Sequence, residues 1–272
     1  MAAPTARHVP NPLTDLGARL VIAHRGNAAD APENTIESFA QALALGADAL
    51  ELDVRVTRDA VPVVIHDPTL YRTTGQRDLV ADMTAAQLSH ADAGATFSKD
   101  AGMSFPYRAR GLTVPTLAAV LERFADVPLL IEVKVPEAVD AVGRALEEAG
   151  ATARAVVGSL IQAAVSPFRA ARLATGASFD EVLRLLPGAL LRRRPAELPY
   201  QALCIPRWYN GMRIPVGALA RTARQAGVVT HVWTVNGPAI AQKLWRAGIQ
   251  GIVTDDPRTM ILAREELLSS GD

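Results

Sequence analysis

The feature that most limits how this chain can fold is a regular alternation of short apolar runs with longer segments of helical period. "RLVIAHRG" is followed by "PENTIESFAQALALG", and "VPLLIEVKV" is followed by "PEAVDAVGRALEEAG". A short apolar run bounded by turn residues is typical of a buried strand, and apolar residues three and four apart are typical of a helix that covers a sheet. Strands that alternate with helices predict a parallel sheet with right-handed crossovers.

Eight such strand–helix units follow one another along the 272 residues, although the fifth strand is short. The predicted strands are 19–26, 47–54, 127–135, 153–160, 175–179, 202–206, 228–236 and 251–257. Eight units in this length predict a (β/α)₈ (TIM) barrel that forms a single domain over residues 1–272. An open doubly wound sheet is the alternative, but it would more often carry a glycine-rich phosphate loop after the first strand, and none is present.

Two segments depart from the alternation. Residues 67–111 are rich in turns and polar residues where the second helix should begin, so we expect an insertion at the mouth of the barrel. Residues 190–195, "LLRRRP", are expected to be a solvated helix end.

The charge balance and the cysteine content bound the possible partners and compartment. Lys plus Arg and Asp plus Glu both number 28, so the chain has no net positive charge that would attract nucleic acid. No apolar run reaches the ~18 residues of a spanning helix, and the N-terminus lacks a signal-peptide pattern. The single Cys204 fits a reducing compartment. We therefore expect a cytoplasmic protein without stable membrane insertion, which binds a small molecule rather than nucleic acid.

Polar residues stand at the carboxyl ends of several predicted strands, where a barrel has its active site. Those of interest are His24, Arg25, Glu51, Asp53, Glu132, Lys134 and Trp233. Buried carboxylates are costly unless a cation or hydrogen bonds compensate them. Glu51 and Asp53 share one face of their strand, as do Glu132 and Lys134, so all four should converge in the barrel mouth.

The stretch "ELDVRVTRDAVPVVIHDP", residues 51–68, predicts a hairpin that rises from the rim and folds back. If Asp59 and Ala60 form a two-residue turn, Arg58 pairs with Val61. The same register places His66 opposite Asp53 and brings an imidazole beside the carboxylates.

Three carboxylates without thiol ligands suit a hard divalent cation such as Mg²⁺ or Ca²⁺. Such a cation beside Arg25 and Lys134 predicts a site for an anion, most simply a phosphate ester. His24 and His66 would flank the phosphorus, one accepting a proton from the nucleophile and the other donating one to the leaving alkoxide.

These residues also carry a family resemblance. "HRGNAADAPENTIESFAQALALGADALELDVRVTRDAVPVVIHDPTLYRTTG" resembles the N-terminal signature of the glycerophosphodiester phosphodiesterases, in which H-R-G, P-E-N-T, E-x-D and H-D recur at similar spacings. "LLIEVK", "VWTVN" and "GIVTDDP" resemble later motifs of the same family. The family's turn usually reads Asp-Gly, whereas this chain has Asp59-Ala60.

The resemblance implies a metal-dependent barrel enzyme that hydrolyses glycerophosphodiesters to sn-glycerol 3-phosphate and an alcohol. It implies that His24 and His66 are the acid–base pair and that Glu51, Asp53 and Glu132 are the metal ligands. It further implies that Arg25 and Lys134 contact the phosphate and that Trp233 forms an aromatic wall of the pocket.

Other functions remain open for the same residues. The carboxylates could pair with Arg25 or Arg55 in a structural network, Lys134 could form a Schiff base, and Trp233 could simply pack. A barrel phosphodiesterase acting on lysophospholipids is the nearest alternative, and it would require an apolar mouth. A phosphate-ester-binding barrel without catalytic activity is the alternative outside enzymes.

Overall fold

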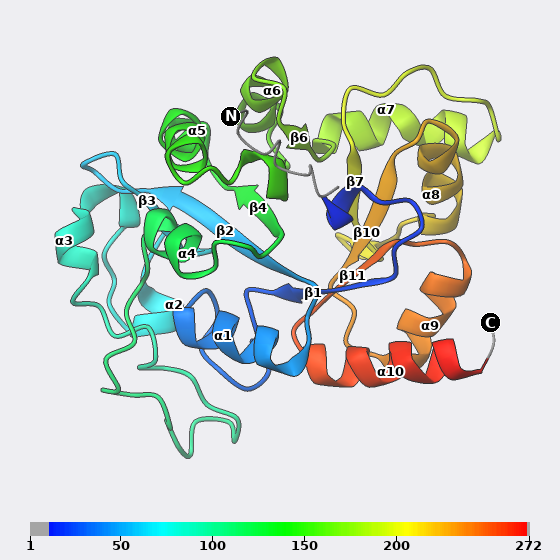
Figure 1. Ribbon diagram of the computed structural model, residues 1–272. Coiled ribbons are helices and arrows are strands. Elements are labelled where there is room, and N and C mark those ends of the chain that lie inside the picture. The colour runs from blue at the N-terminus through cyan, green and yellow to red at the C-terminus, as the bar shows by residue number, and fades with distance from the viewer. Residues whose placement is uncertain (1–10, 271–272) are drawn as a thin grey trace, which may run out of the picture.

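Eight parallel strands form the wall of a barrel in the computed structural model, which describes residues 11–270 (Figure 1). Their order around the wall is β6-β5-β4-β2-β1-β11-β10-β7, and a parallel bridge between Gly176 and Ala202 joins the two end strands. The strands are β1 (Leu20–His24), β2 (Ala49–Val56), β4 (Leu129–Val133), β5 (Ala155–Gly158), β6 (Ala174–Thr175), β7 (Ala202–Pro206), β10 (Val229–Trp233) and β11 (Gly251–Thr254). The predicted barrel is confirmed.

Helices cover the outside of this wall, as Figure 1 shows. They are α1 (Ile36–Leu45), α4 (Leu117–Arg123), α5 (Val139–Glu148), α6 (Gln162–Ala170), α7 (Phe179–Leu190), α8 (Val216–Gln225), α9 (Pro238–Arg246) and α10 (Pro257–Ser269). Among residues 11–270, no helix has the length and apolar character needed to cross a membrane.

Two helix boundaries differ from those that the sequence predicts. Helix α1 begins after Thr35, whose side chain accepts a hydrogen bond from the Ser38 amide at 3.2 Å, so the "PEN" segment stays irregular. The sequence "SPFRAARLA", residues 166–174, predicts a helix, but α6 begins earlier, at Gln162, so Pro167 lies inside it. The helix ends earlier because Arg172 adopts a left-handed φ of 63° and Leu173 donates back to the Phe168 carbonyl at 3.0 Å.

Apolar side chains fill the lower end of the barrel, where the strands begin. The buried cluster includes Leu20, Ala49, Ala202 and Val229, each the first residue of its strand. Leu13, from the short 3₁₀ turn Pro12–Thr14, is fully buried against them and closes this end. The closed lower end leaves the carboxyl ends of the strands as the open mouth.

The hairpin after β2 has a register one residue away from the predicted one. Strand β3 (Pro62–Val64) pairs antiparallel with β2, with Val54 opposite Val64 and Val56 opposite Pro62. Asp53 therefore faces Ile65, whose amide donates to its carbonyl at 2.9 Å, and not His66. The turn has three residues, 58–60, and Ala60 in it adopts a left-handed φ of 58°. Our prediction assumed a two-residue turn, so its register is wrong by one residue.

Between β3 and α4 the chain makes a long excursion that contains α2 (Tyr71–Thr74) and α3 (Ala85–Leu88). It has its own small buried cluster, which joins Val63 and Ile65 of the hairpin to Leu70, Val80, Leu88, Ala91, Ala93 and Val114. Figure 1 shows this excursion beside β2 and α1, in cyan and green. The excursion is thus anchored to the strand that carries Glu51 and Asp53.

Candidate active site

A pocket of about 160 Å³ opens at the carboxyl ends of the strands. Most of the predicted site residues line it: His24, Arg25, Glu51, His66, Glu132, Lys134 and Trp233. Asp53 is fully buried beneath them. Residues that lie more than 200 positions apart in the sequence, such as His24 and Trp233, are thus brought together as predicted.

Neighbouring strands set the acidic residues side by side. His24 is the β1 partner of Glu51, and Asp53 is the β2 partner of Glu132. One carboxylate oxygen from each of Glu51, Asp53 and Glu132 lies within 4.8 Å of the others. This spacing would allow all three to coordinate one divalent cation.

Cationic side chains already compensate Asp53. Arg25 Nε lies 2.9 Å from Asp53 Oδ2, and Lys134 Nζ lies 2.8 Å from both Asp53 Oδ1 and Glu132 Oε1. Asn34 Nδ2 donates to Asp53 Oδ2 at 2.9 Å. The ion pair with Arg25 that the sequence left open is therefore present. Burial alone would raise the pKa of Asp53, but Lys134 and Arg25 outweigh it and lower the pKa.

Glu51 is compensated less fully, by the Arg25 backbone amide, which donates to its Oε2 at 3.1 Å, and by His24 Nε2 at 4.0 Å. Burial, together with the charge on Asp53, raises the pKa of Glu51 to about 8. Arg25, Lys134 and His24 offset only part of the negative charge of the three carboxylates, and a hard cation with oxygen ligands would offset the rest. The residues present therefore fit a Mg²⁺- or Ca²⁺-type site.

His24 is held by a carboxylate from the last strand of the barrel. Its Nδ1 lies 2.6 Å from Asp255 Oδ1, and Asn236 Nδ2 donates to the other oxygen of Asp255 at 2.8 Å. The Nε2 of His24 lies 4.0 Å from Glu51 Oε2. Burial by itself lowers the pKa of His24, but Asp255 and Glu51 outweigh it, so the pKa is raised above 6.5.

His66 is held in a similar way by its neighbour in the chain. Its Nδ1 lies 2.6 Å from Asp67 Oδ1, and Arg72 Nε donates to Asp67 Oδ2 at 2.7 Å. Burial raises the pKa of Asp67, but the hydrogen bonds from Arg72 and His66 outweigh it and lower the pKa to about 2. Both histidines thus use Nδ1 for a carboxylate, which leaves Nε2 for the pocket.

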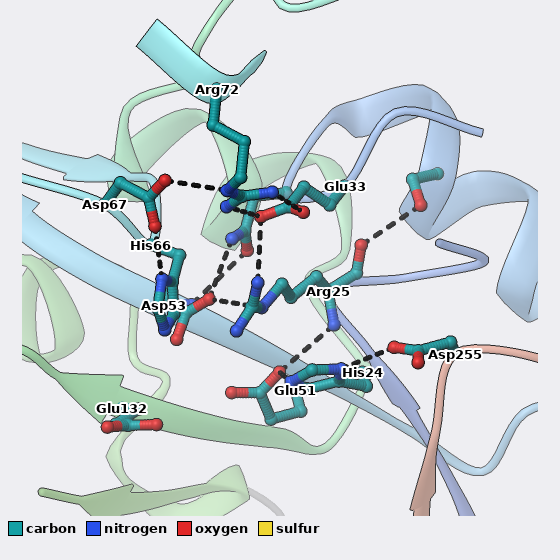
Figure 2. Close-up of polar contacts among 12 residues, drawn as sticks. His24, Arg25, Glu33, Glu51, Asp53, His66, Asp67, Arg72, Glu132 and Asp255 are labelled. Atoms are coloured by element: carbon teal, nitrogen blue, oxygen red, sulfur yellow. Dashed lines mark hydrogen bonds and ion pairs between the residues drawn. The ribbon is translucent and has the colours of Figure 1, made fainter. Parts of the chain in front are cut away.

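Arg72, from helix α2, connects the two sides of the site (Figure 2). Its Nη1 and Nη2 bind both oxygens of Glu33 at 2.5 and 2.8 Å. Glu33 also accepts a hydrogen bond from Arg25 Nη1 at 3.0 Å. A continuous chain of contacts therefore runs from His66 through Asp67, Arg72, Glu33 and Arg25 to Asp53.

The opposite side of the pocket, at the ends of β5, β6 and β7, carries no charged residue. It is lined by Gly158, Leu160, Gly176, Ala177 and Cys204, with Ser159. The Ser159 hydroxyl donates to the Val133 carbonyl at 2.7 Å and is not free for a ligand. Burial raises the pKa of the Cys204 thiol to about 12, so this residue stays a neutral thiol.

Sequence reasoning missed several residues that contact the predicted ones. Asp67 and Asp255 stood in motifs that we singled out, but no role was assigned to them. Asn34 of "PENT" also had no role in the site assigned to it, yet it binds Asp53 directly. Arg72 gave no signal, because a contact between the excursion and "PENT" depends on the path of the chain and not on local spacing.

Comparison with known proteins agrees with this geometry. The model of the Glycerophosphoryl diester phosphodiesterase family matches residues 24–259. The chain belongs to this family. A relative from Caldanaerobacter subterraneus subsp. tengcongensis, "Glycerophosphodiester phosphodiesterase", is 29% identical over 89% of this chain and 96% of its own length.

Two solved structures show the same barrel. The glycerophosphodiester phosphodiesterase of Agrobacterium tumefaciens str. C58 is 25% identical, with a TM-score of 0.71, over 90% of this chain and 99% of its own. An Oleispira antarctica phosphodiesterase, in complex with the product sn-glycerol-3-phosphate, is 25% identical, with a TM-score of 0.72, over 90% and 96%.

Proposed function

We propose that this protein hydrolyses glycerophosphodiesters to sn-glycerol 3-phosphate and an alcohol. The observation that carries the proposal is the pair of histidines in one pocket, each with Nδ1 at 2.6 Å from a carboxylate. A protein that only binds a phosphate ester has no need for two oriented imidazoles. Family membership and the product-bound Oleispira relative support the same reaction.

Glu51, Asp53 and Glu132 would hold one divalent cation, Mg²⁺ or Ca²⁺. When bound, such an ion supplies positive charge that polarises the phosphoryl oxygens. Arg25 and Lys134 line the same pocket and would contact the non-bridging oxygens of the phosphate, which gain charge in the transition state. The ion pairs with Asp53 hold the side chains of Arg25 and Lys134 in place before the substrate binds.

The histidines would divide the proton transfers between them. Because the carboxylate binds Nδ1–H, Nε2 of a neutral imidazole presents a lone pair that can accept the proton of the nucleophile. The second imidazole, in its protonated form, would donate from Nε2 to the leaving alkoxide. Trp233 would form a wall of the pocket against the substrate.

We place this reaction in the cytoplasm, as the single free thiol of Cys204 supports.

The test is the release of sn-glycerol 3-phosphate from glycerophosphocholine, glycerophosphoethanolamine and glycerophosphoglycerol, with Mg²⁺, Ca²⁺ or a chelator. We expect release that needs one of the cations and stops with the chelator. His66→Ala separates an enzyme from a binding protein, since an enzyme keeps its affinity for the ester and loses turnover. Unchanged turnover in this variant would remove His66 from the mechanism.

A further inference from the structure

Helix α7 presents apolar side chains to solvent as well as to the core. Its buried face contains Glu181, Leu185 and Ala189, which are spaced four residues apart. On the outer face Leu183 and Leu190 are 49% and 58% exposed, and Leu191, directly after the helix, is 64% exposed. A solvated helix face is normally polar, so these exposed leucines indicate a further contact.

Five arginines line a groove beside this face, between α7 and α8. The groove consists of three adjoining hollows of about 330, 310 and 390 Å³, joined through shared lining residues. Figure 1 shows the two helices next to each other on the outside of the barrel. The arginines are Arg184, Arg192, Arg193, Arg194 and Arg221. We call these five arginines, together with Leu183, Leu190 and Leu191, the α7 patch.

No acidic side chain neutralises the arginines of the α7 patch. None of the five forms an ion pair with another residue of the described range 11–270. Of the described residues that line the groove, Glu181 alone is acidic, and its two oxygens bind Arg169 at 2.5 and 2.7 Å. The whole chain has zero formal net charge, so the positive charge is a local property of this face. Such a face attracts an anionic partner.

A defined turn joins the leucines to the arginines. Arg192 adopts a left-handed φ of 54°, and its amide donates to the Ala189 carbonyl at 3.3 Å. The Arg193 amide donates to the Gly188 carbonyl at 2.9 Å. These two bonds form a Schellman motif, which ends the helix in a fixed geometry. Residues 190–194 are exposed, as expected of a solvated helix end, and the motif holds their leucines and arginines side by side.

We propose that the α7 patch binds the surface of a membrane that contains anionic lipids. Such a surface offers phosphate groups to the arginines and, just beneath them, an apolar layer to the leucines. Nucleic acid would match the arginines but would leave the leucines in water. Because α7 has 12 residues, it is too short to span a membrane and would lie in its surface. This inference is independent of the proposed function.

The position of the α7 patch leaves the catalytic pocket accessible. Residues 191–201 lead from α7 to Ala202, the first residue of β7, so Arg192, Arg193 and Arg194 lie towards the closed end of the barrel. The pocket opens at the other end of the strands. Membrane binding should therefore leave the turnover of a dissolved ester unchanged.

The experiment measures the partition of the protein onto vesicles by flotation. The vesicles consist of phosphatidylcholine alone or of an equimolar mixture with phosphatidylglycerol. We expect the wild-type protein to float with the anionic vesicles only, and to be released at high ionic strength because salt screens the attraction. Absence of binding to the anionic vesicles at low ionic strength would overturn the proposal.

The triple variant R192Q/R193Q/R194Q should lower the partition coefficient by about 100-fold, because each arginine near an anionic surface contributes about fivefold. The matched control R110Q/R123Q/R144Q removes the same charge at exposed positions outside the α7 patch. It should change the coefficient by less than about twofold, since these charges lie beyond the reach of the surface. Equal losses in the two variants would show that the overall charge drives binding, and would contradict a site at α7.

The double variant L190S/L191S should lower the partition coefficient roughly 10-fold, because part of each leucine side chain enters the apolar layer. The control L262S/L268S replaces two leucines of α10 that are 55% and 57% exposed, and should bind like the wild type. Unchanged partition of L190S/L191S would mean a purely electrostatic contact and would exclude the membrane as the partner of the leucines.

Two other partners are outcomes of the same series. Binding of a single-stranded oligonucleotide without vesicle binding would assign the arginines to nucleic acid. A dimer in sedimentation equilibrium that L190S/L191S dissociates, again without vesicle binding, would assign the leucines to a second copy of the chain. Either result overturns the proposal. Turnover of glycerophosphocholine should be the same in R192Q/R193Q/R194Q and the wild type, so a failure of vesicle binding leaves the proposed function intact.

Discussion

Two histidines on strands of the same barrel, His24 at the mouth and His231 at the closed end, have opposite properties. The carboxylate of Asp255 holds His24 Nδ1 at 2.6 Å, and the pKa of His24 is raised. His231 is fully buried, and its Nε2 donates to the Leu13 carbonyl at 2.9 Å. Burial lowers the pKa of His231 to about 4. The partner and the burial, rather than the residue type, decide whether the pKa of a histidine is raised, as for His24, or lowered, as for His231.

The contrast extends to the space around each ring. His24 faces the pocket, whereas a Cβ on Gly251 would lie 2.2 Å from His231 Nδ1, so only glycine fits beside it. His231 Nδ1 has no hydrogen-bond partner among the described residues. A proton there would be a buried charge without compensation, which the fold excludes at neutral pH.

Removing the mouth histidines should have the largest effect. His24→Gln and His66→Gln are each expected to lower kcat by roughly 10²- to 10⁴-fold, the usual contribution of a general acid or base. Because both rings border the pocket, the urea midpoint of unfolding should not change. His90→Gln, at an exposed position in the excursion, is the control and should keep full activity. If His24→Gln kept wild-type kcat, the proposed difference in role between His24 at the mouth and His231 at the closed end would be wrong.

The opposite result is expected for His231, namely an effect on stability alone. Its pKa of about 4 in the folded state lies below the unfolded value of about 6.5, so the unfolded chain binds more protons at acid pH. The stability that neutral His231 permits is therefore present above pH ~6.5 and is lost as the pH falls towards 4. Between pH 7 and 5 the free energy of unfolding should drop by about 2 kcal/mol from this group.

His231→Gln isolates this contribution, because an amide NH₂ group can still donate to the Leu13 carbonyl but does not titrate. Urea unfolding of both proteins at pH 7 and pH 5 gives the difference directly. Equal losses in the wild type and the variant would show that His231 titrates normally in the fold. Turnover of the variant at pH 7 should match the wild type.

Metal affinity at the mouth should also depend on pH, through Glu51. Its pKa of about 8 means that a cation must displace a proton below that pH. The apparent affinity for Mg²⁺ or Ca²⁺ should rise about tenfold per pH unit from pH 6 to 8 and level off above. Calorimetric titrations in buffers of different ionisation enthalpy should report the release of about one proton at pH 7. An affinity that is flat over this range would show that Glu51 is ionised without the metal.

A smaller effect is expected when the support of His66 is removed. Arg72→Gln breaks the contacts to Asp67 and Glu33 and should lower kcat by roughly 10- to 100-fold, the typical cost of losing a residue that orients an active group. Arg77→Gln is the matched control, since Arg77 lies against the Tyr71 ring and not in the network. Added guanidinium should restore part of the activity of Arg72→Ala. No rescue, together with an altered urea midpoint, would make Arg72 a structural residue.

The barrel and the convergence of its site residues could be predicted from the sequence because both follow from regular geometry. Alternating apolar periods indicate the eight units, and parallel strands end at one rim, which brings Glu51 near Glu132. The hairpin register could not be predicted, because Ala60 adopts a left-handed conformation that its residue type does not favour. The role of Arg72 depends on where a long excursion returns to the barrel, which no local pattern encodes.

The wall of the barrel is weakest between β6 and β7, where β6 has two residues and the single bridge from Gly176 to Ala202 closes the circle. Few backbone hydrogen bonds therefore constrain the uncharged side of the pocket. A mutant library confined to this seam, at Gly158, Gly176 and Ala177, would change which esters the protein accepts and leave its ion and proton chemistry untouched.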